Sequence, residues 1–426
     1  MFRISVGKKK CLNISMKTMD KFTKDQIELS KLTKRLILVP FGQSFRFCNN
    51  SCEFCYLKDY MKSKPLTIDQ CKRIAENTYN WTKHIINELP EDVSISLEII
   101  GGELFIMPDE YYDIYYNLIY NLNNMLSNHN RMFEVLLISN LILNENRLKE
   151  LETLYLNIKN LGIDVNITTS FDLWGRFKNN LDLELWYNNL ESLSSNIQLD
   201  IEVILSDLSI QKYLKEDNSK EVLYFKKLLD QGRKYNICFN EFIPNSNETI
   251  KYVPSNATLI QFYKKLIDNY WNKITELDNF KVSNINISPD YVKSTSYCAE
   301  CAGPVFGLPN ETDHGFDFDY EEFGIYKTYC AETGLLSPWK QSDQILRKDL
   351  YKVSVPIDEW VCLKYPEVVN NYFDKVLKCT SCKFRNSCYN NRQQECYIMH
   401  QFKWKEDKCW KKEVFAYIED KGLIDE

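Results

Sequence analysis

Short apolar segments alternate with longer segments of helical periodicity from about residue 35 to residue 275, and this alternation restricts the fold more than any other feature. The segment FEVLLI at residues 133–138 has the length and composition of a strand, and a helical pattern follows it. Neighbouring parallel strands need a crossover connection, which is usually a helix. The alternation therefore predicts βαβ units that build a parallel sheet.

The predicted elements divide the chain into three parts. Strands are expected at residues 35–40, 94–100, 133–138, 165–170, 197–205 and 236–242. Helices are expected at residues 67–89, 109–127, 145–161, 182–193, 219–234 and 257–275, with Thr67 as the first N-cap. About six βα repeats suit an open or partial (β/α)6 barrel of the TIM-like kind, with its chemistry at the carboxyl ends of the strands. We therefore predict an α/β fold with a lead-in at 1–30, a barrel at 31–285 and an irregular, cysteine-rich domain at 286–426.

Cysteine is the residue type that says most about chemistry. The chain has 15 cysteines, an odd number, and its N-terminus lacks the apolar core of a secretory signal. A disulfide framework is therefore disfavoured, and clustered thiols in a reducing compartment indicate metal binding. The net charge of −6 disfavours a nucleic-acid partner, and no apolar stretch reaches the ~20 residues of a membrane span. We expect a cytoplasmic protein that binds neither nucleic acid nor membrane.

Cys48, Cys52 and Cys55 form a C-x3-C-x2-C triplet in the loop after the first expected strand. Three thiolates can hold three irons of a four-iron cluster and leave the fourth iron without a protein ligand. An open iron can chelate the amino and carboxylate groups of S-adenosylmethionine, and electron transfer into the sulfonium then cleaves a carbon–sulfur bond. The alternative interpretation is a zinc site or three unrelated thiols.

The triplet resembles that of the radical S-adenosylmethionine (radical SAM) family, in which an aromatic residue precedes the last cysteine, as Phe54 does here. Gly101-Gly102-Glu103, at the end of the second expected strand, is similar to the family's glycine-rich motif. That motif places backbone and a carboxylate near the methionine amino group of the cofactor, and its glycines permit close approach. The resemblance also implies cofactor contacts from four later residues: Asn140, Ser170, Asp172 and Arg176.

Eight cysteines of the second domain resemble the SPASM extension, which is found in radical SAM enzymes that modify peptides and proteins. The resemblance implies two auxiliary 4Fe–4S clusters. The ligands of the first would be Cys298, Cys301, Cys330 and Cys396. The ligands of the second would be Cys379, Cys382, Cys388 and Cys409. The spacing between Cys388 and Cys396 is longer than the family pattern, which puts the first site in doubt, and structural zinc remains the alternative.

The SPASM resemblance implies a peptide or protein substrate. The expected reaction begins when a 5′-deoxyadenosyl radical abstracts hydrogen from a peptide residue. It ends with a carbon–carbon, thioether or ether cross-link, or a similar modification, in a ribosomally made peptide. An external donor such as flavodoxin or ferredoxin would supply the electron, and Asp172 is the residue considered as a proton acceptor. The alternatives are formylglycine formation, as in anaerobic sulfatase maturases, dehydrogenation of a small molecule, and an iron–sulfur electron carrier without catalysis.

Overall fold

The computed structural model describes a large part of the predicted barrel and short pieces of the C-terminal region. The described residues are 35–39, 47–53, 55, 65, 67–99, 102–193, 197, 199–215, 218–231, 235–242, 250–275, 305–307, 311–312, 315–316, 381–384 and 409–423. Several predicted site residues lie outside them: Phe54, Gly101, Cys298, Cys301, Cys330, Cys379, Cys388 and Cys396.

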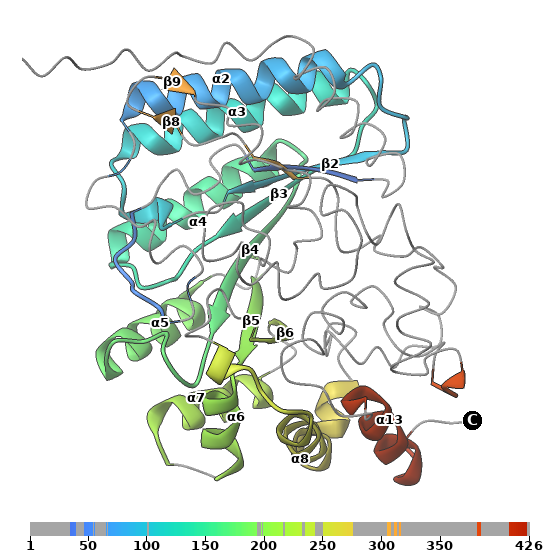
Figure 1. Cartoon of the computed structure of the whole chain (residues 1–426). Helices are drawn as coiled ribbons and strands as arrows, with labels where there is room; N and C mark the ends of the chain where they lie inside the picture. Colours follow the sequence, from blue (N-terminus) through green and yellow to red (C-terminus); the bar gives the residue numbers. More distant parts are fainter. Residues whose placement is uncertain are drawn as a thin grey trace, which may run out of the picture.

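A parallel β-sheet forms the centre of the fold. Its strands, in spatial order, are β6 (Asn236–Glu241), β5 (Leu199–Leu205), β4 (Asp164–Phe171), β3 (Phe133–Ile138), β2 (Ser94–Ile99), β1 (Arg35–Val39) and β7 (Val305–Gly307). Every neighbouring pair is parallel. From β1 to β6 the spatial order follows the chain order (Figure 1). The predicted α/β class with a parallel sheet is therefore confirmed.

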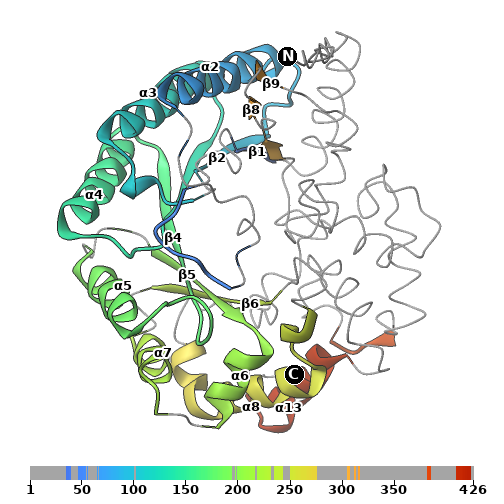
Figure 2. The same ribbon diagram turned by 60° about the vertical axis from the view of Figure 1, so that its left-hand side comes forward.

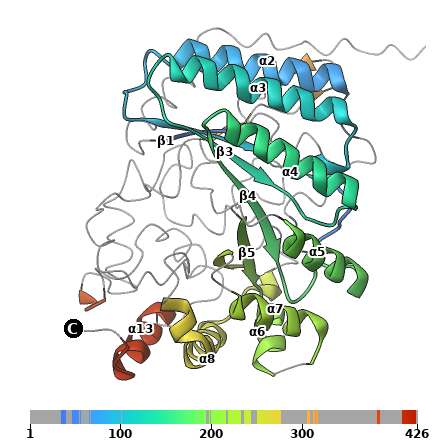
Figure 3. The same ribbon diagram turned by 180° about the vertical axis from the view of Figure 1, so that it is seen from behind.

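Helices connect the strands and cover one side of the sheet. They are α2 (Ile68–Ile85), α3 (Asp109–Ser127), α4 (Glu145–Asn160), α5 (Asn180–Ser192), α6 (Asp207–Leu214), α7 (Lys220–Asp230) and α8 (Asn256–Thr275), with the 3-10 helices η2 (Leu104–Ile106) and η4 (Ile250–Tyr252). Figure 2 shows the helices as an outer layer around the strands, and Figure 3 shows α2 and α3 side by side. No helix in the described part of the chain combines the length and the apolar character that crossing a bilayer demands.

The core lies between the sheet and the helices because strand side chains alternate in direction. In β3, Phe133, Val135 and Leu137 are buried, and the residues between them are only partly buried. Aromatic rings from β4, β6 and helices α5 to α8 pack together beneath the second half of the sheet: Phe171, Trp186, Tyr213, Phe225, Phe239 and Phe262. Each such ring contributes about 1.5–3 kcal/mol by leaving water.

Two helices were not predicted from the sequence. Helix α6 is only 8 residues long, so it shows little periodicity, and its start is set by Ser206, whose Oγ accepts the backbone N–H of Ser209. Helix α13 (Trp410–Asp420) lies in the region expected to be irregular. It packs against α8 (Figure 1), where the ring of Trp410 stacks on Tyr263 with 4.9 Å between centroids. A short antiparallel pair, β8 (Glu311–Thr312) with β9 (Gly315–Phe316), also lies in that region.

Candidate functional site

The cysteine loop, residues 47–55, follows β1 and is tied to segments that follow two other strands. The backbone N–H of Glu103, after β2, donates to the carbonyl oxygen of Phe47 at 3.0 Å. The backbone N–H of Glu53 donates to the carbonyl oxygen of Gly175, after β4, at 2.7 Å. The carboxyl ends of parallel strands meet at one edge of a sheet. The loop therefore lies at the edge where the sequence predicts the chemistry.

Asn140, which follows β3, adds a third attachment. Its Nδ2 donates to Cys48 Sγ at 3.4 Å and to Asn49 Oδ1 at 2.7 Å. Its Oδ1 accepts the backbone N–H of Ile142 at 2.8 Å. Because the amide oxygen is engaged by an N–H donor, the hydrogen-bond network fixes which end of the amide faces the sulfur. The loop is thus bonded to residues after β2, β3 and β4.

Two of the thiols receive N–H donors from a single residue. The backbone N–H of Asn50 donates to Cys48 Sγ at 3.4 Å, and its Nδ2 donates to Cys52 Sγ at 3.3 Å. Burial raises the pKa of the Cys48 thiol to about 11; the charge of Glu103 adds to the rise, and the donors from Asn50 and Asn140 oppose it. Burial also raises the pKa of Cys52. Both thiols therefore hold their protons at neutral pH unless a metal displaces them.

Cys55 completes the triplet and is joined to Cys52 through the backbone. Its backbone N–H donates to the carbonyl oxygen of Cys52 at 3.1 Å, which closes a turn. Among the described residues, no group of three or more His, Cys, Asp or Glu side chains is gathered closely enough to hold a metal ion. None of the three loop cysteines forms a disulfide. The loop therefore brings three thiols into one short segment without drawing all three sulfurs around one point.

Glu103 joins the ends of β2 and β3. Its side chain is fully buried, and its Oε1 accepts the backbone N–H of Phe105 at 3.1 Å. Its Oε2 accepts the backbone N–H of Asn140 at 2.6 Å, and the Ser139 hydroxyl lies 3.2 Å from each oxygen. Burial raises the pKa of the carboxyl group to about 7, against the lowering effect of these donors. The carboxylate predicted to lie near a cofactor thus has protein groups as its hydrogen-bond partners.

Asp172 is fully buried directly after β4. Its Oδ1 accepts the backbone N–H of Trp174 and, at 3.0 Å, the hydroxyl of Ser209. Its Oδ2 has no hydrogen-bond partner within the described part of the chain. Burial raises the pKa of this carboxyl group well above its ordinary value, so the neutral form is favoured. A neutral, buried carboxyl group with one unused oxygen suits the binding of a polar group better than it suits general base catalysis.

Arg176 links the ends of β3 and β4. Its Nη1 donates to the Ser170 hydroxyl, and its Nη2 donates to the carbonyl oxygen of Asn140 at 3.2 Å. The guanidinium carbon lies 5.7 Å from the ring centroid of Phe177. Only 4% of the side chain is exposed, and within the described residues its Nε has no hydrogen-bond partner. The structure therefore brings together four predicted site residues, since Glu103 and Arg176 both bond to Asn140 and Arg176 also bonds to Ser170.

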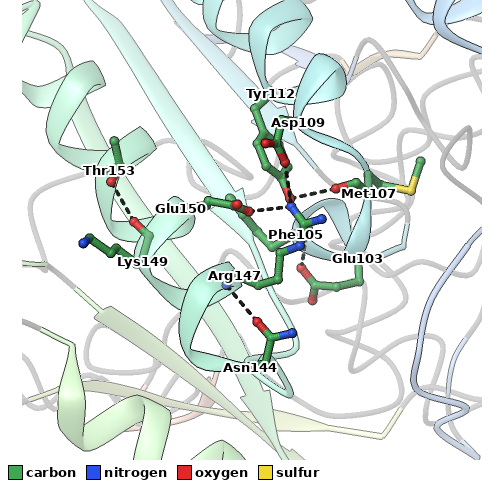
Figure 4. A network of polar contacts seen from close by, with 10 residues as sticks. All are labelled: Glu103, Phe105, Met107, Asp109, Tyr112, Asn144, Arg147, Lys149, Glu150 and Thr153. Carbon is green, nitrogen blue, oxygen red and sulfur yellow. Dashed lines mark hydrogen bonds and ion pairs between the residues drawn. The ribbon is translucent and has the colours of Figure 1, made fainter.

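A second polar network borders the site at the beginnings of α3 and α4 (Figure 4). Arg147 Nη1 lies 2.9 Å from Asp109 Oδ1, 2.6 Å from Glu150 Oε2 and 2.9 Å from the Tyr112 hydroxyl. That hydroxyl donates to the carbonyl oxygen of Met107 at 2.9 Å. Arg147 therefore holds the beginnings of two neighbouring helices together beside η2, the 3-10 helix that Glu103 caps.

Several residues that contact the cysteine loop or the carboxylates beside it were not predicted from the sequence: Asn49, Asn50, Ser139, Gly175 and Ser209. Gly175 has a φ of +86°, and a Cβ at this position would lie 3.0 Å from Cβ of Glu53. Only glycine adopts this left-handed conformation without strain. Asn50 was detectable as a polar residue between two candidate ligands, but the contacts of the others depend on loops that meet only after folding.

Two predicted auxiliary ligands, Cys382 and Cys409, lie within the described residues, and both are near α13. Cys409 directly precedes the helix, and Cys382 packs partly buried against the core. The ring of Phe384 stacks on Phe415 of the helix with 5.4 Å between centroids. This contact holds the segment 381–384 against the same helix that begins after Cys409.

Comparison with known proteins adds little. No family model matches the chain, and no curated protein matches its sequence. A solved structure that it matches is a mutant O-GlcNAc hydrolase from Thermobaculum terrenum. The two chains share 12% sequence identity, with 85% of this chain and 79% of that chain covered, at a TM-score of 0.26. A likeness this distant carries no inference about fold or function.

Proposed function

We propose that the chain is a radical SAM enzyme whose catalytic 4Fe–4S cluster is held by Cys48, Cys52 and Cys55. The observation that carries this proposal is the attachment of the cysteine loop to residues after β2, β3 and β4. A loop bound in this way presents its thiols at the carboxyl edge of a parallel sheet, where α/β proteins bind their ligands. We further propose that the sheet belongs to a partial (β/α)6 barrel.

The donor set fits an iron–sulfur cluster. Its three side chains are all thiols, and Cys48 and Cys52 accept N–H donors, which stabilise the charge of cluster sulfur. When bound, such a cluster with S-adenosylmethionine supplies one electron to cleave a carbon–sulfur bond and provides a radical that abstracts hydrogen.

The protein's own groups suit the binding of S-adenosylmethionine beside the loop. Asp172 Oδ2 and Arg176 Nε are buried polar atoms that lack partners within the described residues. Buried polar groups are nearly always satisfied, so a ligand that supplies partners would stabilise both. We assign Arg176, with Ser170, to an anionic group of the cofactor, and the neutral carboxyl of Asp172 to a hydroxyl group. Glu103 and Asn140 hold the surrounding strand ends in place.

We propose a peptide or protein substrate, with residues 286–426 as a SPASM-like domain that holds two auxiliary clusters. Cys382 and Cys409 support the second auxiliary cluster because Cys409 directly precedes helix α13 and the segment that contains Cys382 packs on the same helix through Phe384. The modification would be a cross-link or a similar change in a ribosomally made peptide, and a flavodoxin or ferredoxin would deliver the electron. Formylglycine formation remains the second candidate, because it would use the same cysteine arrangement.

Anaerobic reconstitution with iron and sulfide tests the reaction type. Reduced protein incubated with S-adenosylmethionine should release 5′-deoxyadenosine and methionine in equal amounts, measured by liquid chromatography with mass spectrometry. If neither product forms above the level of a no-protein control, the enzyme proposal fails. Incubation with peptides encoded beside the gene, followed by mass spectrometry, then separates cross-linking from formylglycine formation.

Iron counting tests the ligands. A variant with Cys48→Ala, Cys52→Ala and Cys55→Ala should lose about four irons per chain and retain the remainder. Cys71→Ala is the matched control because Cys71 is a buried thiol in α2 outside the loop. Equal iron in the triple variant and in the wild-type protein would refute the assignment.

A further inference from the structure

The turn that presents Asn140 has an unusual backbone. Leu141, the next residue, is fully buried and has a φ of +54°, which non-glycine residues rarely adopt. Asn189 Nδ2 donates to the carbonyl oxygen of Leu141 at 2.8 Å, and the Ser139 hydroxyl accepts the N–H of Leu141 at 3.1 Å. Such a strained backbone persists only where surrounding contacts impose it. The strained turn therefore indicates that the position of Asn140 matters.

Every hydrogen-bonding group of Asn140 is engaged. Its backbone N–H donates to Glu103 Oε2, and its carbonyl oxygen accepts from Arg176 Nη2. Its amide oxygen accepts from Ile142, which leaves Nδ2 directed at Cys48 Sγ and Asn49 Oδ1. The side chain is only 9% exposed, so water competes weakly for these bonds. Asn140 is thus held rigidly with one amide hydrogen towards a predicted cluster ligand.

We propose that Asn140 is a positioning residue that sets the reduction potential of the cluster through its N–H···S bond to Cys48. This inference rests on the proposed function, because it requires the cluster at the cysteine loop. The step concerned is the transfer of one electron from the external donor to the cluster, in which no bond forms or breaks. The residue acts on the sulfur and does not touch the substrate.

The direction of the effect follows from charge. Reduction adds one negative charge, which spreads over the iron and the sulfur atoms, and an N–H donor stabilises the more negative state. Loss of the donor from Asn140 should make the potential more negative. A hydrogen bond to a charged group is stronger than one to a neutral group, so the bond from Asn140 should be stronger in the reduced state than in the oxidised state. The ratio of reduced to oxidised cluster at a fixed potential should then fall about tenfold, a shift of about 59 mV for one electron.

Two variants remove the donor in different ways. Asn140→Asp keeps an oxygen for the N–H of Ile142 but lacks the amide hydrogens, and Asn140→Leu keeps the shape without either polar atom. The potential is measured by redox titration, followed by EPR, of the signal that disappears in the triple cysteine variant. Both variants should lower the potential by about 59 mV, which corresponds to a tenfold fall in the ratio of reduced to oxidised cluster. The added negative charge of Asp should lower the potential at least as far. Asn140→Gln, which retains an amide donor, should recover part of the shift.

Asn189→Leu is the matched control. Asn189 braces the same turn through Leu141 and Leu143, and neither of its bonds reaches sulfur. Asn189→Leu should leave the reduction potential unchanged. If it shifts the potential as much as the Asn140 variants do, the effect comes from loosening of the turn, and the proposal is overturned. If neither Asn140 variant assembles the cluster, pulsed EPR of the Asn50→Ala protein labelled with 15N-asparagine provides the test, because Asn50 also donates to the cysteine sulfurs in the wild-type protein. A resolved nitrogen coupling supports the bond, and its absence refutes it.

The outcomes separate this inference from the proposed function. If the triple cysteine variant loses a cluster but the Asn140 variants keep the wild-type potential, the inference fails and the enzyme assignment stands. If the triple variant keeps all its iron, the enzyme assignment fails, and the inference fails with it.

Discussion

Gly175 shows how a single residue without a side chain shapes the site. Its carbonyl oxygen accepts the N–H of Glu53, and its φ of +86° with a near contact to Cβ of Glu53 excludes a side chain. Gly175→Ala should cost about 1–2 kcal/mol of folding free energy and push the cysteine loop away. Urea unfolding measures the first effect, and alkylation rates of Cys48 and Cys52, followed by mass spectrometry, measure the second.

Gly162→Ala separates the two effects. Gly162 has a similar φ of +78°, but a Cβ there meets nothing within 4 Å. This variant should show a comparable loss of stability and wild-type alkylation rates. If both alanine variants leave the alkylation rates unchanged, the contact with Glu53 has no role in placing the loop.

Glu103 gives the folded protein a proton that the unfolded chain does not hold. Burial raises the pKa of its carboxyl from the ordinary 4.5 to about 7. The stabilisation that this proton provides is complete below pH 4.5 and is lost as the pH rises through 7. Glu103→Gln should therefore remove up to about 3 kcal/mol of pH dependence across that window, although it also weakens the contacts with Ser139 and Asn140.

Unfolding in urea at a series of pH values measures this slope. Glu110→Gln is the control because Glu110 is an exposed carboxylate on the neighbouring helix α3. The prediction is wrong if the slope between pH 4.5 and pH 7 survives in Glu103→Gln as it does in the control.

Individual site residues were predictable only where they belong to a local pattern. Cys48 and Cys52 are recognised by their spacing, and Glu103 by its place at a strand end. The contact between Asn140 and Cys48 joins residues 92 positions apart, so it depends on the path of two loops, which no local pattern encodes. The partners of Glu103 were missed for the same reason.

At the scale of elements, an aromatic contact holds helix α13 against α8. Trp410 is fully buried and lies nearly parallel to the ring of Tyr263 on α8, at an interplanar angle of 6°. Trp410→Ala should destabilise this contact by about 3–5 kcal/mol, because a large buried ring leaves a cavity. Faster hydrogen exchange in both α13 and α8 would show the loss.

Lys412→Ala is the control on the same helix because Lys412 is exposed. It should leave exchange in α8 at the wild-type rate. Equal protection of α8 in the wild-type protein and in Trp410→Ala would mean that α13 does not shield it.

Long elements were predicted within a few residues of their observed ends. Helix α3 spans Asp109–Ser127 as expected, since its 19 residues give a clear periodic pattern. Helix α2 begins directly after Thr67, as its cap predicted, but it ends at Ile85 instead of continuing to residue 89. Tertiary contacts decide such ends: Arg131 donates to the carbonyl oxygens of Ile86, Leu89 and Pro90, which follow the helix.

At the scale of the whole molecule, the sheet order was predictable because each crossover places the next strand beside the last. The position of β7 was not, because it pairs with β1 although their sequence positions are more than 260 residues apart. Three residues in a strand produce no alternation from which a pattern can be read. Packing against an existing edge, and not local propensity, determines such a strand.

The three thiols of the cysteine loop lie outside the apolar core, although Phe47 at the start of the loop packs against it. None of the three loop cysteines belongs to the buried apolar cluster between the sheet and the helices. The triple cysteine variant should therefore keep the wild-type far-UV circular dichroism and a cooperative thermal transition, with at most a few degrees of change in Tm. A loss of helical signal would mean that these thiols are needed for the fold.

The attachment of the cysteine loop to three strand ends limits how this motif can be transplanted. A graft of residues 47–55 onto another scaffold would carry the thiols and the donors of Asn50, but it would leave behind Asn140 and Gly175. A protein engineer would therefore have to move the ends of β2, β3 and β4 as a unit, with their connecting turns. By the same reasoning, an insertion or a deletion in the turn after β3 would displace the sulfur atoms of the cysteine loop even though no cysteine had changed.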